Sequence, residues 1–326
     1  MRLRWDSYKR PIRNALKQGR ALLRGYRFRY ARVQDPERAG RYGHLWSEST
    51  TPIPERGTPL IRANRVSNLR LAAARIDALR LAPGEIFSFC DRTGEPTVRN
   101  GFREAPVFVR GTVQTDIGGG LCLLATNLFT TFLRAGCEIL ERHSHSIDAY
   151  GEARFYALGQ DAAVAYGYKD LVVRNSTAAG LQVRVQVLAD RGEVVSSLWG
   201  EEPPRLRFTI ASTIVTEIAP EHAGDLPGWI VETVRSVHTG DGDPARLRPD
   251  FRTTSRYAPC RKSPVELRGE RGRESSLLAD PERRRRGDLF DGALFQFDAA
   301  ELQLQDPRQI EPRDHQEDRA ERQNDV

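Results

Sequence analysis

Residues 118–146 read GGGLCLLATNLFTTFLRAGCEILERHSHS and hold the most specific pattern in this 326-residue sequence. Three glycines permit a tight turn, because glycine adopts backbone conformations that other residues avoid. The apolar side chains that follow recur at helical spacing as far as Gly136, a residue type that often ends helices. The pattern predicts a helix over residues 121–135 and then a strand over residues 139–147.

Cys122 would be the second residue of that helix. The dipole and the unpaired backbone N–H groups at a helix N-terminus stabilise a thiolate, and the same groups can form an oxyanion hole. Gly118, Gly119 and Gly120 would allow a substrate backbone to approach closely, so we predict that they form a binding loop. Cys122 is therefore a candidate nucleophile.

Two histidines on the following strand are candidates for the base. Alternate residues of a strand share one face, so His143 and His145 would lie on the face of Ile139 and Ile147. If these isoleucines point inward, both histidines do so as well, and either could reach Cys122. Of the two, His145 is the favoured base.

A third group must orient the base. Asp161 is the favoured candidate, and Asp170 and Asn175 are alternatives. A helix-borne Cys, a strand-borne His and then an Asp or Asn on a later strand follow the chain order of papain-like and transglutaminase-like thiol enzymes. We therefore predict Cys122 as nucleophile, His145 as base and Asp161 as orienting group.

Two other interpretations of these residues stay open. A cysteine at the start of an apolar helix is most often a small hydrophobic core residue, as we predict for Cys137. Cys122, His143, His145 and an Asp could also form a four-ligand zinc set, but their spacing is not specific to zinc. We predict neither a metal nor a cofactor.

The elements around this stretch predict an α+β fold, with the Cys122 helix packed on an antiparallel sheet. We expect a basic N-terminal arm and loop-rich connector over residues 1–60 and the main α+β domain over residues 61–205. A small β-rich extension would occupy residues 206–262. The tail, residues 263–326, is highly charged with low aliphatic content, so it is predicted to be disordered.

The main domain should begin with a helix over residues 68–81, capped by Ser67 and stopped by Pro83-Gly84. A hairpin is predicted around Arg110-Gly111. Further strands are predicted at residues 86–89, 161–166, 171–175, 181–187, 194–199, 208–210 and 229–231.

The positive charge of residues 1–32 suggests an anionic partner but does not identify it. Residues 1–32 contain eleven Lys and Arg against one acid, interleaved with leucines. Such a basic amphipathic segment can make peripheral contact with an anionic membrane, and the alternative is a solvated helix at the edge of the domain. The four-arginine run at residues 283–286 of the tail lacks interleaved aromatic residues, so no nucleic-acid partner is predicted.

The sequence contains no apolar run of bilayer-spanning length and no secretory signal peptide. We therefore expect a cytoplasmic location, with or without contact to the membrane surface. The four cysteines form no C-x-x-C pair, and structural disulfides are not expected in that compartment.

Six short blocks within residues 64–200 resemble the VanW family, which is named from an accessory protein of B-type vancomycin resistance clusters. Their order and spacing match, which makes the resemblance specific. The blocks are NLRLAA (68–73), PGEIFSF (83–89), GGGLC (118–122), ERHSHS (141–146), QDA (160–162) and DLVVRN (170–175).

The resemblance implies a bacterial cell-envelope context and an association with peptidoglycan or glycopeptide resistance, but no reaction. The family usually has Gln directly after the cysteine and a Ser-Thr or similar pair two residues on. This chain has Leu123, Ala125 and Thr126 at those positions. A Gln beside the nucleophile could support an oxyanion, and that support would be missing here.

Two functions follow from these residues. The first is a thiol-dependent hydrolase or acyl transferase acting on peptidoglycan peptides or their precursors. The alternative is a non-enzymatic envelope or peptidoglycan-binding module, in which the glycine turn is a recognition loop and the histidines are hydrogen-bonding core residues.

Overall fold

The computed structural model describes residues 14–37, 39–55, 57–109, 112–148, 151, 154–222, 224–238 and 247–261. The compact unit that contains them spans residues Met1–Ser263. The predicted disordered tail and residues 1–13 of the predicted basic arm lie outside the described residues.

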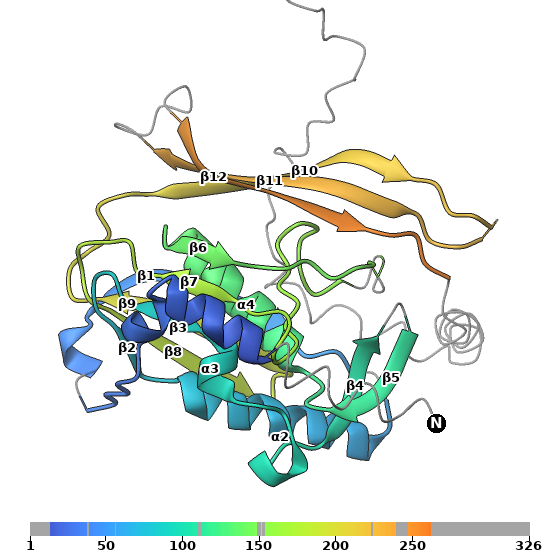
Figure 1. Cartoon of the computed structure of the whole chain (residues 1–326), viewed down its shortest axis with the longest axis horizontal. Coiled ribbons are helices and arrows are strands. Elements are labelled where there is room, and N and C mark those ends of the chain that lie inside the picture. The colour runs from blue at the N-terminus through green and yellow to red at the C-terminus, as the bar shows by residue number, and fades with distance from the viewer. Residues whose placement is uncertain are drawn as a thin grey trace, which may run out of the picture. The chain divides into compact units, whose positions relative to one another are not determined.

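The described residues form a mixed α+β fold whose sheets are antiparallel, so the predicted α+β class is confirmed (Figure 1). The helices are residues 14–23, α2 (Pro59–Ile76), α3 (Phe89–Thr93) and α4 (Leu121–Arg134), with 3-10 turns η1 (Tyr26–Arg29), η2 (Ala39–Arg41) and η3 (Val98–Asn100). The strands are β1 (His44–Pro52), β2 (Leu79–Leu81), β3 (Ile86–Ser88), β4 (Glu104–Val109), β5 (Thr112–Ile117), β6 (Glu138–Glu141), β7 (Val172–Arg174), β8 (Leu181–Leu188), β9 (Glu193–Gly200), β10 (Phe208–Ile218), β11 (Gly228–His238) and β12 (Leu247–Tyr257). Among the described residues, no helix has the length and apolar character needed to cross a bilayer.

The strands form four sheets. A four-stranded sheet has the order β1-β9-β8-β2, and a three-stranded sheet has the order β3-β7-β6. The C-terminal strands form a second three-stranded sheet, β10-β11-β12, and β4 and β5 form the predicted hairpin. The helix predicted over residues 121–135 is confirmed as α4.

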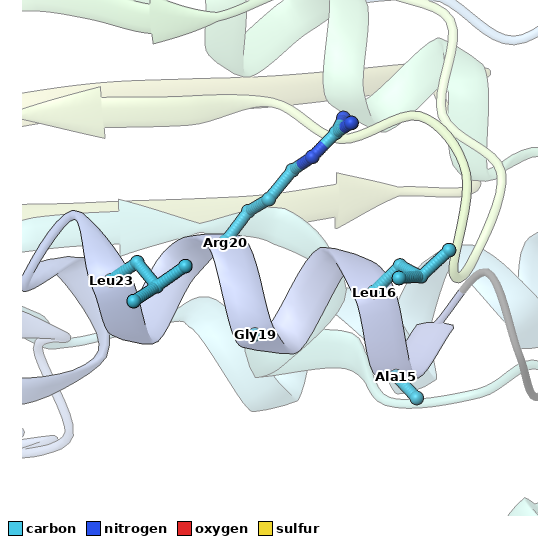
Figure 2. Close-up of a pocket in the computed structure, with 5 residues that line it drawn as sticks. All are labelled: Ala15, Leu16, Gly19, Arg20 and Leu23. Atoms are coloured by element: carbon cyan, nitrogen blue, oxygen red, sulfur yellow. The ribbon is translucent and has the colours of Figure 1, made fainter.

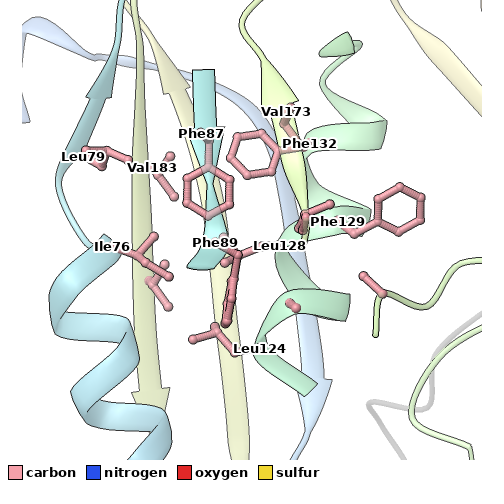
Figure 3. Packing of buried hydrophobic residues seen from close by; sticks show 14 of the residues in the cluster. Ile76, Leu79, Phe87, Phe89, Leu124, Leu128, Phe129, Phe132, Val173 and Val183 are labelled. Atoms are coloured by element: carbon pink, nitrogen blue, oxygen red, sulfur yellow. The ribbon is translucent and has the colours of Figure 1, made fainter. Parts of the chain in front are cut away.

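The apolar core lies between α4 and the strands around it (Figure 3). Phe132 of α4 packs against Phe87 of β3, with their ring centroids 5.1 Å apart. Phe129 and Leu128 of α4 are also fully buried. Full burial of each such side chain contributes roughly 1.5–3 kcal/mol, so this face of α4 fixes the helix that carries Cys122.

The segment predicted as a loop-rich connector contains β1, which pairs with β9 along its length. The buried residues of β1 are Ser47, Ser49 and Thr51, which are polar and so hid the alternation of a half-buried strand. Asn127 of α4 donates hydrogen bonds to the Ser49 carbonyl at 2.8 Å and to Thr51 Oγ1 at 2.9 Å. Polar contacts therefore join β1 to α4.

The helix predicted over residues 68–81 is displaced toward the N-terminus. It begins after Thr58, whose side chain accepts a hydrogen bond from the Ile61 N–H, and Pro59 occupies the first turn, where proline is favoured. It ends before Ala78, which has a left-handed φ of 56°. The apolar residues beyond that point belong to β2, which pairs with β8.

Arg235 of β11 connects the C-terminal sheet to the end of α4. Its guanidinium donates to the carbonyls of Leu133 and Cys137, at 3.1 and 2.7 Å, and pairs with both carboxylate oxygens of Asp250. Its side chain is 4% exposed. A cation at the C-terminal end of a helix also interacts favourably with the helix dipole.

We predict that Arg235→Met lowers the free energy of unfolding by about 3 kcal/mol, because it leaves Asp250 and two carbonyls without their partner. Chemical denaturation measures the change. The matched control is Arg252→Met on the neighbouring strand, whose side chain is 60% exposed and pairs with Glu232. That exposed pair should be worth less than about 1 kcal/mol. Equal losses in the two variants would contradict the structural role of Arg235.

Candidate active site

The glycine turn sets the start of α4. Gly118 and Gly120 have φ values of 91° and 105°, in the left-handed region where glycine is favoured. A Cβ atom on Gly118 would lie 2.6 Å from Pro96 Cβ. Asn68 of α2, which is fully buried, donates a hydrogen bond of 3.0 Å to the Gly119 carbonyl.

Gly118 and Gly119 are themselves buried. The turn is thus held inside the fold and delivers Cys122 to the first turn of α4. Its role as a binding loop stays a prediction.

Cys122 is half-buried at this helix start. Its Sγ lies 3.5 Å from both the N and the O of Val164. Cys137, in contrast, is fully buried in the core, and burial raises its pKa to about 12. Cys137 is therefore a hydrophobic core residue, as the sequence predicted, whereas the Cys122 thiol is half-buried beside polar backbone atoms.

Residues 161–164 run along the start of α4 without forming the predicted strand. Their N–H groups donate to two side chains and to one carbonyl, and they form no strand ladder. The Ala162 N–H donates to Thr126 Oγ1 at 2.9 Å, and the Val164 N–H donates to the Cys122 sulfur. The Ala163 N–H donates to the His143 carbonyl at 2.8 Å.

Asp161 lies at the centre of the site and is fully buried. Its Oδ2 accepts hydrogen bonds from the His145 backbone N–H at 2.7 Å and from His145 Nδ1 at 2.5 Å. Its Oδ1 accepts from Arg142 Nη2 at 2.7 Å and from the Tyr257 hydroxyl at 2.6 Å. One carboxylate therefore accepts four hydrogen bonds.

The imidazole of His145 lies between this carboxylate and the thiol. Burial alone would lower the pKa of His145, but hydrogen bonding to Asp161 and to Cys122 raises it to about 10. Because Nδ1 donates to Asp161, Nε2 is the ring nitrogen available for the hydrogen bond with Cys122. The ring of Tyr156 stacks on the imidazole, with centroids 6.0 Å apart.

The pKa values of Cys122 and Asp161 lie below the ordinary values of a thiol and a carboxyl group. Burial alone would raise the pKa of Cys122, but the hydrogen bond and the charge of His145, together with the Val164 N–H, lower it. Burial would also raise the pKa of Asp161, and His145 and Arg142 lower it to about 2. The shifts in pKa therefore favour the thiolate form of Cys122, the imidazolium form of His145 and the carboxylate form of Asp161.

The prediction that both histidines share an inward face is wrong. β6 ends at Glu141, after an irregularity in its pairing with β7, so period-two alternation does not extend to the histidines. His143 is 40% exposed and its Nε2 lies 3.1 Å from Glu141 Oε1, whereas His145 is 13% exposed. Only His145 contacts Asp161.

The alternative orienting groups lie elsewhere. Asp170 accepts hydrogen bonds from the Ser88 hydroxyl and the Cys90 N–H at the start of α3. Asn175 donates to the carbonyls of Leu81 and Ala179. Within the described residues, no group of three or more His, Cys, Asp and Glu is arranged to hold a metal ion.

Sequence reasoning missed two residues that complete the site. Arg142 donates to both the carboxylate and the carbonyl of Asp161 and also to Ser255 Oγ of β12, at 2.6 Å. Tyr257, at the end of β12, donates to Asp161 and accepts from the Gly159 N–H. Arg142 lies inside the ERHSHS block, which was a usable signal. Tyr257 lies in a segment of weaker resemblance to the family, residues 256–260, but about a hundred residues separate it from Asp161 and no local pattern connects the two.

The three residues at the family-pattern positions have different surroundings. Leu123 and Ala125 are buried in the apolar core. Thr126 is also buried, and its Oγ1 accepts a hydrogen bond from the N–H of Ala162, the residue next to Asp161. The threonine therefore takes part in placing the orienting carboxylate.

Comparison with known proteins matches part of this chain, including most of the site, to a family model. Residues 64–199 match the family model described as "VanW like protein". That range contains Cys122, Arg142, His145 and Asp161, and Tyr257 lies beyond it.

Two curated proteins are similar to this chain. The vancomycin B-type resistance protein VanW of Enterococcus faecalis (strain ATCC 700802 / V583) is 29% identical over 154 residues, 47% of this chain and 55% of that protein. The uncharacterized protein YoaR of Bacillus subtilis (strain 168) is 32% identical over 123 residues, 38% of this chain and 39% of that protein. The chain thus spans about half of the first relative and less of the second. No solved structure matches.

We predict that Cys122 is alkylated at a lower pH than an ordinary thiol. His145→Gln should raise the pKa of the Cys122 thiol, because a hydrogen bond and a positive charge are lost. The rate of reaction with iodoacetamide as a function of pH measures this value, with Cys122→Ser as the background. His222→Gln, at an exposed histidine, is the matched control and should change nothing. An unchanged thiol pKa in His145→Gln would contradict the pairing.

We also predict that Asp161→Asn lowers the free energy of unfolding by about 3–5 kcal/mol, because it leaves two buried cationic groups without their anion. Asp161 has a depressed pKa, so its contribution is present above the unfolded value of about 3.9 and is lost as the pH falls through about 2. His145 has a raised pKa, so its contribution is lost as the pH rises through about 10.

Denaturation curves across pH should therefore show the largest difference between wild type and Asp161→Asn at mildly acidic to neutral pH. The difference should narrow toward both extremes. Asp190→Asn, in the exposed turn between β8 and β9, is the control and should cost less than about 0.5 kcal/mol. A difference in the free energy of unfolding that stays constant across pH would contradict the ion pairs of Asp161 with His145 and Arg142.

Proposed function

Because residues 64–199 make this chain a VanW family protein, we propose that it is a thiol-dependent hydrolase or acyl transferase acting on peptidoglycan peptides or their precursors. The observation that carries the proposal is the arrangement of Cys122, His145 and Asp161 at the start of α4. A polarised thiol, a base and a carboxylate that orients the base are the parts needed for nucleophilic acyl transfer.

In the first step the Cys122 thiolate attacks the carbonyl carbon of an amide bond and forms a C–S bond. The carbonyl electron pair moves onto oxygen, and the backbone N–H of Cys122 supplies a hydrogen bond that stabilises it. The neighbouring N–H groups of Leu121 and Leu123 already donate to the carbonyls of Gly118 and Gly120. As the C–N bond breaks, the imidazolium of His145 gives its proton to the departing amine. A thioester and a neutral imidazole remain.

In the second step a water molecule gives a proton to His145 while its oxygen attacks the thioester carbon. The C–S bond breaks, and a carboxylic acid, the thiolate and the imidazolium result. An amine that replaces water would yield a new amide, which is acyl transfer. Asp161 keeps Nδ1 of His145 protonated through both steps, so that Nε2 exchanges the proton.

The order of the elements supports this chemistry. The helix with Cys122 precedes the segment with His145, and Asp161 follows on a later segment, as in papain-like and transglutaminase-like thiol enzymes. We propose that the chain shares this order of catalytic elements with those enzymes. The substrate class rests on the family's association with vancomycin resistance, the property for which the Enterococcus relative is named.

We expect the full chain to release peptides from purified peptidoglycan or to cleave isolated stem peptides, and Cys122→Ala to lower that rate by about 10³-fold or more. Mass spectrometry of the products measures the cleavage and would also detect a thioester on Cys122. Cys260→Ala is the matched control, because Cys260 is likewise half-buried and outside a disulfide, and it lies away from the site.

Full retention of wall-peptide activity in Cys122→Ala would overturn the proposal. So would a covalent adduct on another cysteine in its place. If the chain binds peptidoglycan but changes none of it, and Cys122→Ser binds equally well, the non-enzymatic binding module is the correct function.

A further inference from the structure

The helix over residues 14–23 and the turn after it present an apolar surface to solvent. Figure 2 shows this helix from the side, with Leu16 and Leu23 two turns apart. Leu16 is 63% exposed, Leu23 89% and Phe28 80%. Leu22 and Val33 are also exposed. Single exposed leucines are ordinary on proteins, but a cluster of them on one short segment indicates a contact surface.

Cations surround these apolar side chains. Arg20, Arg24, Arg27 and Arg29 are exposed, and the sequence has no Asp or Glu from residue 14 to residue 34. Within the described part of the chain, none of these four arginines forms an ion pair with a carboxylate. The segment therefore combines apolar contacts with uncompensated positive charge.

Lys17 holds the opposite side of the helix against the protein. Its Nζ lies 3.0 Å from Glu141 Oε1 and 3.6 Å from Asp170 Oδ2. Burial alone would lower the pKa of Lys17, but the two carboxylates raise it, so the ammonium stays charged. This contact fixes the helix with its leucines outward.

We propose that this segment, residues 14–33, is a docking surface for an anionic lipid bilayer. The leucines and Phe28 would enter the boundary between headgroups and acyl chains, and the arginines would bind lipid phosphates from the same face. Charge complementarity selects this occupant, because a second copy of the segment would place cations against cations.

Lys17 links the docking surface to the segment that carries His145. Glu141, which binds Lys17, also contacts His143 and begins the segment that carries His145. The lipid contact itself does not rest on the proposed reaction, and Cys122→Ala should bind lipid like the wild type.

The test is co-sedimentation of the full chain with phosphatidylcholine vesicles that contain or lack phosphatidylglycerol. We expect binding to the anionic vesicles, weakening as salt is added. Arg20→Gln with Arg24→Gln should lower the partition coefficient by about 25-fold, since each cation contributes about fivefold. Leu16→Glu with Leu23→Glu should lower it by at least about tenfold.

Leu60→Glu is the matched control, because Leu60 is 69% exposed at the start of α2, where an acid is tolerated. It should bind anionic vesicles like the wild type, and circular dichroism should show all variants folded. Equal binding to neutral and anionic vesicles, or unchanged binding in the Leu16/Leu23 variant, would overturn the proposal. So would a wild-type dimer in ultracentrifugation that the Leu16/Leu23 variant abolishes.

Discussion

The buried carboxylate of Asp161 is the constraint on which the rest of this structure depends. An isolated carboxylate is costly to bury, so it persists in the interior only where donors surround it. Here Arg142, Tyr257 and two N–H groups of His145 supply them. Each donor comes from a segment whose position the fold must then fix. The carboxylate thus sets the orientation of the imidazole, and the imidazole sets the protonation of Cys122.

This constraint explains why the C-terminal sheet belongs to the same unit as the matched family region. Tyr257 and Ser255 of β12 reach the site through Asp161 and Arg142, and Arg235 of β11 holds the far end of α4. Burial and the charge of Asp161 raise the pKa of the Tyr257 phenol, so its hydroxyl remains a donor. The helix that carries Cys122 is therefore held at both ends by neighbouring elements.

The sequence predicted the parts of the fold whose signals are local. The period of α4 and the glycine turn placed Cys122 correctly at a helix start, because apolar spacing reports directly on one face of a helix. β1 escaped prediction because its buried face consists of Ser47, Ser49 and Thr51. The residue pair His143 and His145 was misassigned because a strand was assumed to continue where the backbone leaves its sheet. Contacts between distant segments have no local pattern, so the donors on β12 were not predictable.

The most direct test of this account is the protonation state of His145 across pH, read from the ¹⁵N resonances of its ring and assigned by their loss in His145→Gln. The account predicts an imidazolium with both nitrogens protonated through neutral pH, titrating near pH 10. A neutral imidazole that titrates near the ordinary value of 6.5 would show that Asp161 does not control the pair, and would contradict the account.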